Sequence, residues 1–357
     1  MENVTFGNYF SLFSFSVRYF SSLSLGLTSL GLALSLTTLP GCNSRSGPDS
    51  GNPAVLADTT TRPVVVDTVL LKRQAMRRDS LKADSIVKKS GQLPGAILPG
   101  HRIIAFYGNI RSKGMGILGR EPKEQMLAKF RKVQKEWQDA EPGLPIQPAL
   151  HSVTITAQAA AGKDGKYRLM NSKSTIEETI KWAKDNNCIV FLDVQVGLSD
   201  LEHELHKLEP YLKDPIVHMG IDPEFAMATK GVRPGKKIGT YDAKDVNYAI
   251  DFLARIVSEN KLPPKVLTVH RFTQGMITNT KNIKLDPRVQ VVMHMDGWGN
   301  PILKKDSYKA YVEKQPVQYT GFKLFYEYDA RPAPHHIMTP KEVLAELTPK
   351  PLYIQYQ

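Results

Sequence analysis

The chain has 357 residues, of which 41% are hydrophobic and 23% are charged, and its formal net charge is +12. This length allows one large domain or two small ones, and the 25 glycines and 24 prolines are too few for a collagen-like or largely disordered chain. The positive charge favours anionic partners such as phospholipid surfaces or acidic glycans. We expect no nucleic-acid partner, because the sequence holds no zinc finger, aromatic RNA-binding signature or basic recognition helix.

Residues 1–41 are predicted to form an export signal. Residues 21–40 are small and apolar without a charge, and this run ends at Leu39-Pro40-Gly41-Cys42. A cysteine after Leu-x-Gly resembles the lipobox of bacterial lipoproteins, which implies that Cys42 becomes the lipidated first residue of the mature chain. The alternative is an uncleaved anchor, since the run is barely long enough to cross a bilayer. Either interpretation places the rest of the chain at the cell envelope, outside the cytoplasm.

Residues 42–99 are predicted to form a flexible, basic tether. Residues 43–63 are rich in Ser, Gly, Pro, Asn and Thr and show no apolar period. Residues 69–89 have a loosely helical apolar spacing among many lysines and arginines. That segment is either a basic helix that lies on an anionic membrane or a solvated spacer helix.

From residue 100 onward, β-rich apolar segments alternate with amphipathic ones. The predicted strands are 103–109, 152–158, 189–195, 216–224, 266–272, 289–296, 321–329 and 352–357. The predicted helices are 124–140, 174–186, 200–212, 243–260, 306–314 and 339–347, with a short irregular helix over 274–283. Such alternation indicates parallel strands joined by crossover helices. Eight units over residues 100–357 predict a single (β/α)8 TIM-type barrel that ends on strand 8.

A doubly wound open sheet is the alternative fold, and it would place a glycine-rich phosphate loop after the first strand. Residues 114–119 formally fit G-x-G-x-x-G. We expect no helix directly after them, and no acidic residue closes the second strand, so we interpret them as a loop over the barrel mouth.

Polar residues recur with i, i+2 spacing where the predicted strands end, which is where TIM barrels hold their active sites. The candidate catalytic residues are Asp193, Asp222, Glu224 and Asp296. The candidate substrate-binding residues are Tyr107, Asn109, Gln195, His270, His294, Trp298, Lys323, Tyr326, Glu327, Tyr353 and Gln355. Because each unpaired buried polar group costs a few kcal/mol, a lined pocket explains the pattern. The aromatic members either stack on sugar rings or pack the rim for stability.

Asp222 and Glu224 are the most specific of these signals. Two carboxyl groups this close disfavour joint ionisation, so the pKa of one should rise, as a general acid requires. Asp193, Asp296 and Glu327 are the candidates for the second carboxyl group that glycoside hydrolysis requires beside the general acid.

The run Gly220-Ile221-Asp222-Pro223-Glu224-Phe225 resembles the acidic motif on the fourth strand of family 18 chitinases and their relatives. The resemblance implies that Glu224 is the general acid and that Asp222 orients it. The chain departs from that motif at Val217, Gly220, Pro223 and Met295. Val217 and Gly220 stand where the motif has aspartates, and Pro223 lies between the two acidic residues. Met295 stands where the family has a tyrosine before the acid of strand 6, which is Asp296 here.

The barrel region as a whole resembles a family of bacterial lipoproteins that carries no established activity. The runs FLDVQVG, GIDPEF, MDGWG, GFKLFY and YIQYQ carry this resemblance. The sequence therefore predicts a membrane-anchored, glycoside hydrolase-like enzyme that acts on a cell-envelope or extracellular glycan by carboxylate chemistry. Its partners would be the membrane, through a lipid anchor, and a glycan or other small polar ligand. A non-catalytic glycan-binding barrel is the alternative.

A metal-dependent hydrolase that uses His270 and His294 is a further alternative, because the pair resembles part of the amidohydrolase arrangement. That family also has a His-x-His on strand 1, where this chain has Tyr107 and Asn109, and an Asp on strand 8, where it has Gln355 and Gln357. We therefore expect His270 and His294 to share no metal ion with Asp222 or Asp296, and we expect no other cofactor. Cys188 precedes an apolar run and is interpreted as a small buried hydrophobe rather than a nucleophile.

Overall fold

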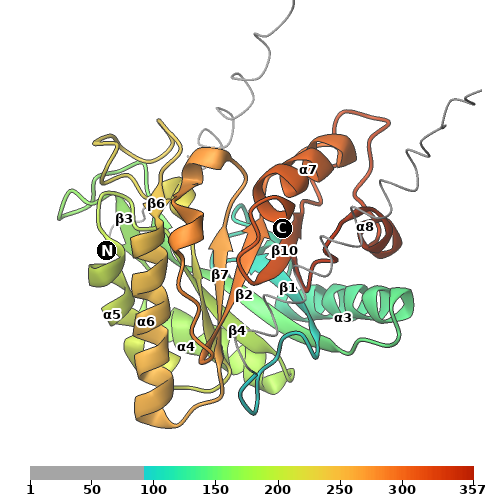
Figure 1. Ribbon diagram of the computed structural model, residues 1–357, viewed down its shortest axis with the longest axis horizontal. Coiled ribbons are helices and arrows are strands. Elements are labelled where there is room, and N and C mark those ends of the chain that lie inside the picture. The colour runs from blue at the N-terminus through green and yellow to red at the C-terminus, as the bar shows by residue number, and fades with distance from the viewer. Residues whose placement is uncertain (1–91) are drawn as a thin grey trace, which may run out of the picture.

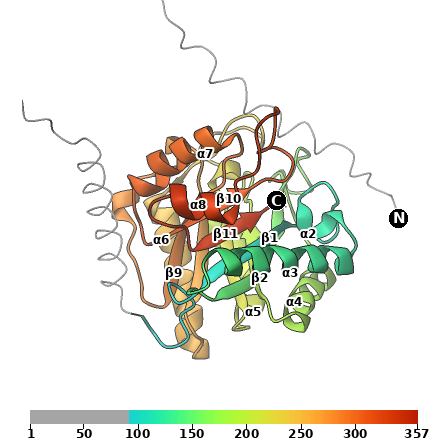
Figure 2. The ribbon, with the colours of Figure 1, turned by 90° about the vertical axis from the view of Figure 1, so that its right-hand side faces the viewer.

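Figures 1 and 2 show the computed structural model, which describes residues 92–357. The export signal, Cys42 and most of the predicted tether lie outside the described residues, so the inferences about them stay predictions. Within residues 92–357, no helix is both long and apolar enough to cross a membrane. Helices surround a central set of strands in both views.

Eight parallel strands form a closed barrel. In spatial order they are β1 (Arg102–Gly108), β2 (Ile146–Ala157), β4 (Ile189–Val194), β5 (Val217–Ile221), β7 (Lys265–His270), β9 (Val289–Met295), β10 (Tyr319–Leu324) and β11 (Tyr353–Tyr356). Strand β1 pairs in parallel with both β2 and β11, so the sheet closes on itself. The predicted (β/α)8 barrel is confirmed, and the closure excludes the open doubly wound sheet.

Helices connect the strands along the outside of the barrel. They are α2 (Ile117–Arg120), α3 (Lys123–Ala140), α4 (Lys173–Asp185), α5 (Leu201–Leu212), α6 (Ala243–Asn260), α7 (Pro301–Tyr308) with the π-helical turn η6 (Lys309–Glu313), and α8 (Pro340–Glu346). One-turn helices are η3 (Pro223–Phe225), η4 (Gln274–Met276) and η5 (Thr280–Asn282). Strand β3 (Arg168–Met170) pairs antiparallel with β2, and β6 (Tyr241–Asp242) pairs with β8 (Ile277–Thr278).

The strands alternate between two hydrophobic layers. Outward residues such as Phe106 pack on the helices, and the ring of Phe106 lies 4.4 Å from that of Phe130 in α3. Inward residues such as Ala105, Phe191 and Val292 fill the barrel interior. The interior is therefore a packed core, and most of its polar side chains gather at its upper end.

The segment before β1 closes the lower end of the barrel. Leu98 is buried among the inward residues of the strands. The Gln290 side chain of β9 accepts hydrogen bonds from the backbone N–H groups of Ile97 and Leu98 and donates one to the Leu98 carbonyl oxygen. Access to the interior is thereby restricted to the opposite end, where the strands finish.

Three local features differ from the sequence predictions. Strand β2 begins at Ile146, six residues before the predicted start at Ser152, and it runs through Pro148. Strand β5 ends at Ile221, because Pro223 starts the one-turn helix η3. A short helix, α2, does begin directly after Gly116, where we expected none.

Candidate functional site

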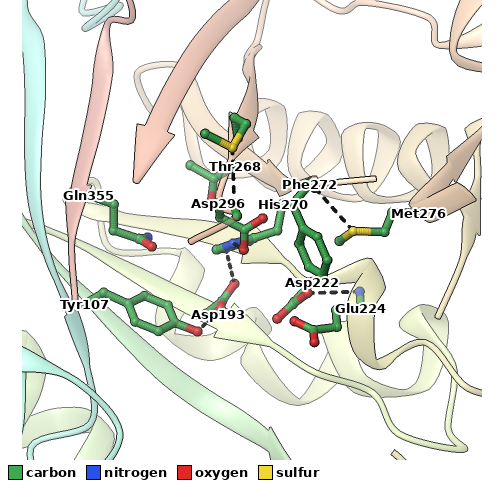
Figure 3. A network of polar contacts seen from close by, with 12 residues as sticks. Tyr107, Asp193, Asp222, Glu224, Thr268, His270, Phe272, Met276, Asp296 and Gln355 are labelled. Carbon is green, nitrogen blue, oxygen red and sulfur yellow. Dashed lines mark hydrogen bonds and ion pairs between the residues drawn. The ribbon is translucent and has the colours of Figure 1, made fainter. Parts of the chain in front are cut away.

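Polar side chains from the strand ends gather around the barrel axis (Figure 3). One set is between 3 and 8% exposed and faces the mouth: Tyr107, Gln195, Asp222, Asp296 and Lys323. A second set has no exposed surface: His151, Asp193, His270, His294, Tyr353 and Gln355. All of these except His151 are residues that the sequence analysis selected. The site therefore has one layer with slight exposure and one layer that is fully buried.

His270 lies between two carboxyl groups in the buried layer. Its Nδ1 is 2.9 Å from Asp296 Oδ2, and its Nε2 is 3.4 Å from Asp193 Oδ1. Burial lowers the pKa of His270, but the charges of Asp193 and Asp296 outweigh burial and raise that pKa well above its ordinary value. Burial likewise raises the pKa of Asp193, but the charge of His270 and the contact with His151 bring it well below its ordinary value.

His151 completes this buried group, and the sequence analysis missed it. It projects inward from the middle of β2, with its Nε2 3.4 Å from Asp193 Oδ1 and its Nδ1 2.5 Å from the Tyr353 hydroxyl. The Gln355 amide nitrogen also lies 3.1 Å from the Nδ1 of His151. Burial lowers the pKa of His151 to about 4. The inward alternation of Ala149, His151 and Val153 was the signal available, but the predicted strand began after it.

Asp222 is fixed by two hydrogen bonds at the mouth. Its Oδ1 accepts from the backbone N–H of Glu224 at 3.0 Å, which caps the one-turn helix η3. Its Oδ2 accepts from the Gln195 amide at 3.1 Å, and Gln195 is itself held by the backbone N–H of Ala157. Burial raises the pKa of Asp222 to about 7, and the negative charges of Asp296 and Asp193 act in the same direction.

Glu224 is half-buried beside Asp222, and Figure 3 shows the two carboxyl groups next to each other. Among the described residues, its carboxyl group has no hydrogen-bond or ion-pair partner. Burial and the neighbouring charges of Asp222 and Asp296 raise the pKa of Glu224 well above its ordinary value. The pair shares one side because η3 turns the chain at Pro223, and not because both residues continue a strand, as the sequence analysis expected.

Lys323 supplies a positive charge to the mouth without an ion pair within the described residues. Its ammonium nitrogen lies 3.8 Å from the centroid of the Tyr107 ring, a cation–π contact. Burial lowers the pKa of Lys323, while the charges of Asp296 and Asp222 oppose that shift. Neither Lys323 nor Arg271 pairs with Glu224. The side chain of Arg271 instead donates to backbone carbonyl groups and to Gln315.

Gly220 provides the space in which the buried group meets. It is the inward residue of β5, between Asp193 on β4 and Thr268 on β7. A Cβ atom at this position would lie 2.3 Å from Asp193 Oδ1 and 2.9 Å from His151 Nε2. The glycine that departs from the chitinase-like motif therefore lets side chains of β4 and β7 meet across β5.

His294 also fits into its position because a neighbouring residue is a glycine, but its ring does not contact Asp193. A Cβ atom at Gly321 would lie 2.6 Å from His294 Nδ1. Its ring centroid is 5.2 Å from that of His270 and 4.9 Å from that of Tyr353. Within residues 92–357, neither ring nitrogen has a hydrogen-bond partner. Burial lowers the pKa of His294 well below its ordinary value.

Two predicted substrate-binding residues, Asn109 and Tyr326, are held by contacts outside the buried polar group. Asn109 donates hydrogen bonds to the Val153 carbonyl oxygen and to the Asn171 side chain, which ties the first loop to β2. Tyr326 stacks on Tyr356 on the outer side of the strands, and Lys129 of α3 lies over its ring. Both residues have structural contacts in the fold.

Glu327 and Trp298 lie at the rim. Glu327 is 3.5 Å from both Arg120 and Arg331, and it lines a pocket of about 420 Å³ between the loops that follow β1 and β10. Phe325 and Tyr328 line the same pocket. Trp298 is half-buried, with its ring centroid 5.8 Å from that of Tyr328.

Comparison with known proteins adds little to this geometry. No protein-family model and no curated protein matches the chain. Among solved structures, a GH18 chitinase from Pseudoalteromonas aurantia is similar over 72% of this chain and 93% of that chain, with 12% sequence identity and a TM-score of 0.33. The (β/α)8 fold stands on the strand pairing of the chain itself.

Proposed function

We propose that the protein is a glycoside hydrolase-like enzyme that acts on a cell-envelope or extracellular glycan, with Glu224 as its general acid. The observation that carries this proposal is the Asp222–Glu224 pair at the mouth, where Glu224 has no cationic partner among the described residues and burial raises its pKa. A carboxyl group that stays protonated near neutral pH can donate its proton to a glycosidic oxygen. Asp222 keeps the backbone of Glu224 in place and disfavours its ionisation.

Asp296 is the second carboxyl group of the proposed reaction. Its Oδ2 is held by His270, whereas its Oδ1 has no hydrogen-bond partner in the described part of the chain. The other two candidates are engaged, since Asp193 lies between histidines and Glu327 between arginines. In the hydrolysis, the bond between the anomeric carbon and the glycosidic oxygen breaks, and the leaving oxygen takes the proton of Glu224. The oxygen of a water molecule bonds to the anomeric carbon, and the proton that this water loses is taken up by Asp296 and passes to the Glu224 carboxylate, which restores the acid.

The rim supports a glycan as the ligand. Tyr328 and Trp298 are half-buried aromatic residues in the loops that follow β10 and β9. Tyr328 also lines a pocket of about 420 Å³, a volume in the range of small-molecule sites. Sugar rings bind such surfaces through apolar contacts, while polar groups fix their orientation.

The proposal is tested by turnover of defined glycans. The full-length chain is incubated with reducing-end-labelled oligosaccharides from envelope and extracellular polysaccharides, and products are separated by chromatography. We expect new reducing ends from at least one glycan class. Saturable binding without cleavage of any of them would contradict the enzyme proposal and would support the non-catalytic binding function.

We also propose that Cys42 is lipidated and anchors the barrel to a membrane, outside the cytoplasm. The run Leu39-Pro40-Gly41-Cys42 behind an apolar stretch supports this. Mass spectrometry of the membrane fraction should show a diacylated N-terminal cysteine, and C42A should release the protein. Mature protein that still carries residues 1–41 would contradict the anchor.

E224Q should stabilise the protein, and the gain should grow with pH. Below the pKa of the unfolded state, about 4.3, the carboxyl group is neutral in both states. As pH rises above that value, the unfolded chain ionises Glu224 while the folded chain resists, because its folded-state pKa is raised. We expect E224Q to exceed the wild type by about 1–2 kcal/mol near pH 7.5 and to match it near pH 4, as measured by denaturant unfolding. E202Q, at an exposed glutamate, is the control. A difference in the free energy of unfolding between E224Q and the wild type that does not change with pH would contradict the raised pKa.

A further inference from the structure

Three buried ligand-type atoms converge beneath the Asp222–Glu224 pair: His151 Nε2, Asp193 Oδ1 and His270 Nε2. They come from β2, β4 and β7 and lie within 4.8 Å of one another. All three side chains have no exposed surface. Within residues 92–357, none of the three atoms has a hydrogen-bond partner. Each histidine nitrogen lies within ion-pair distance of Asp193 Oδ1, so the three atoms face one another. Buried polar atoms normally make hydrogen bonds, so their convergence on one point without one indicates a shared ligand.

The separations of these atoms fit a metal ion better than direct contact. Each histidine nitrogen is 3.4 Å from Asp193 Oδ1. That is longer than charge-assisted N–H···O hydrogen bonds, which are about 2.7–2.9 Å. Ligands at about 2.0–2.1 Å from a tetrahedral ion are separated from one another by about 3.3 Å.

The outer atoms of the three side chains are held as they are in metal sites. Nδ1 of His270 lies 2.9 Å from Asp296 Oδ2, and Nδ1 of His151 lies 2.5 Å from the Tyr353 hydroxyl. The Tyr107 hydroxyl donates to Asp193 Oδ2 at 3.3 Å. Histidine ligands typically donate their second ring N–H to a carboxylate or another oxygen, which orients the ring and fixes the tautomer.

Gly220 leaves the inner face of this group uncovered. A Cβ atom there would approach Asp193 Oδ1 to 2.3 Å and His151 Nε2 to 2.9 Å, and these are two of the three converging atoms. Glycine at this position thus keeps free the space that an ion would occupy.

We propose that His151, Asp193 and His270 bind a divalent transition-metal ion of the zinc class inside the barrel. Two imidazoles and one carboxylate form a borderline ligand set that suits Zn²⁺ and its neighbours better than Ca²⁺ or Mg²⁺. The site differs from the alternative considered in the sequence analysis, because His151 and Asp193, and not His294, join His270. The inference does not rest on the proposed glycan chemistry.

The test is metal binding by the full-length chain after removal of metals with a chelator. Zn²⁺ titration by calorimetry should show about one equivalent, and Co²⁺ should give the visible absorption of a low-coordinate site. D193N and H151Q should weaken Zn²⁺ binding by more than about 100-fold, since each removes a direct ligand, and G220A should do so by filling the space. H218Q, at another fully buried barrel histidine, should leave binding unchanged.

Variants at residues that are not ligands separate a loss of metal binding from a loss of folding. D296N and Y353F keep all three ligands and remove only the groups that orient His270 and His151, so each should weaken binding by about 10–100-fold. Circular dichroism and thermal unfolding establish that each variant is folded, and Zn²⁺ should raise the melting temperature of the wild type. A folded wild type that binds no Zn²⁺ near one equivalent would overturn the proposal. So would binding that survives D193N and H151Q, because surface histidines would then hold the ion.

Discussion

E224Q is expected to lower the rate of glycan hydrolysis by about 10²–10⁴-fold, because an amide keeps the shape of the side chain but has no proton to transfer. Binding of the same glycan should change little, since the amide can still donate a hydrogen bond to the glycosidic oxygen. The measurement is kcat and KM for wild type and variant on one labelled oligosaccharide. The loss should appear mainly in kcat, as for an interaction made only in the transition state.

The matched control is E202Q, at an exposed glutamate in the first turn of α5. It should retain wild-type rates. In the wild type, kcat should fall as pH rises through the pKa of the acidic pair, because the acid must be protonated to act. Burial, together with the charges of Asp296 and Asp193, raises the pKa of its Asp222 member to about 7. Equal activity of E224Q and the wild type would contradict the acid role.

K304M should destabilise the protein by about 3–5 kcal/mol, the usual result of removing one partner of a buried ion pair. Lys304 and Asp329 are each 1% exposed, and their charged atoms lie 2.9 Å apart. The ammonium group also donates to the carbonyl oxygens of Gly297 and Lys323, so it ties the loop after β9 to the end of β10. Thermal unfolding should show a drop of roughly 10 °C in the melting temperature.

The neighbouring substitution K305M is the control. Lys305 pairs with Glu346, but both side chains are more than a third exposed, so its loss should cost less than about 1 kcal/mol. The double variant K304M/D329N should recover part of the lost stability, because it no longer buries an unpaired charge. If K304M unfolds at the same temperature as K305M, the buried Lys304–Asp329 pair does not contribute the expected stability.

The sequence predicted the barrel because strand and helix patterns alternate with little interruption from residue 100 onward. The inward positions of Asp193, His270 and His294 followed from the i, i+2 spacing at the strand ends, since side-chain direction alternates along a strand. That reasoning fails where a strand stops. β10 ends at Leu324, so parity no longer applies beyond it, and Tyr326 packs on the outside of the strands.

His151 could not be found by examining strand ends, because it lies in the middle of β2 and Pro148 interrupts the β-rich pattern before it. Its contact with Asp193, and the contact of Asp193 with His270, depend on which strands face each other across the barrel. Strands β4 and β7 are separated by β5, and their side chains meet only because β5 contributes Gly220 at that level. Sequence spacing carries no information about such a gap, so the buried cluster required the three-dimensional arrangement.

The most direct test of the proposed glycan chemistry is a crystal structure of full-length E224Q with an oligosaccharide bound. We expect the sugar at the mouth beside the aromatic rim, with its glycosidic oxygen within about 3.2 Å of the introduced amide. The Oδ1 atom of Asp296 should face the anomeric carbon. A sugar bound away from Asp222 and Asp296, or a position 224 side chain turned out of the mouth, would contradict the assignment of Glu224 as the acid.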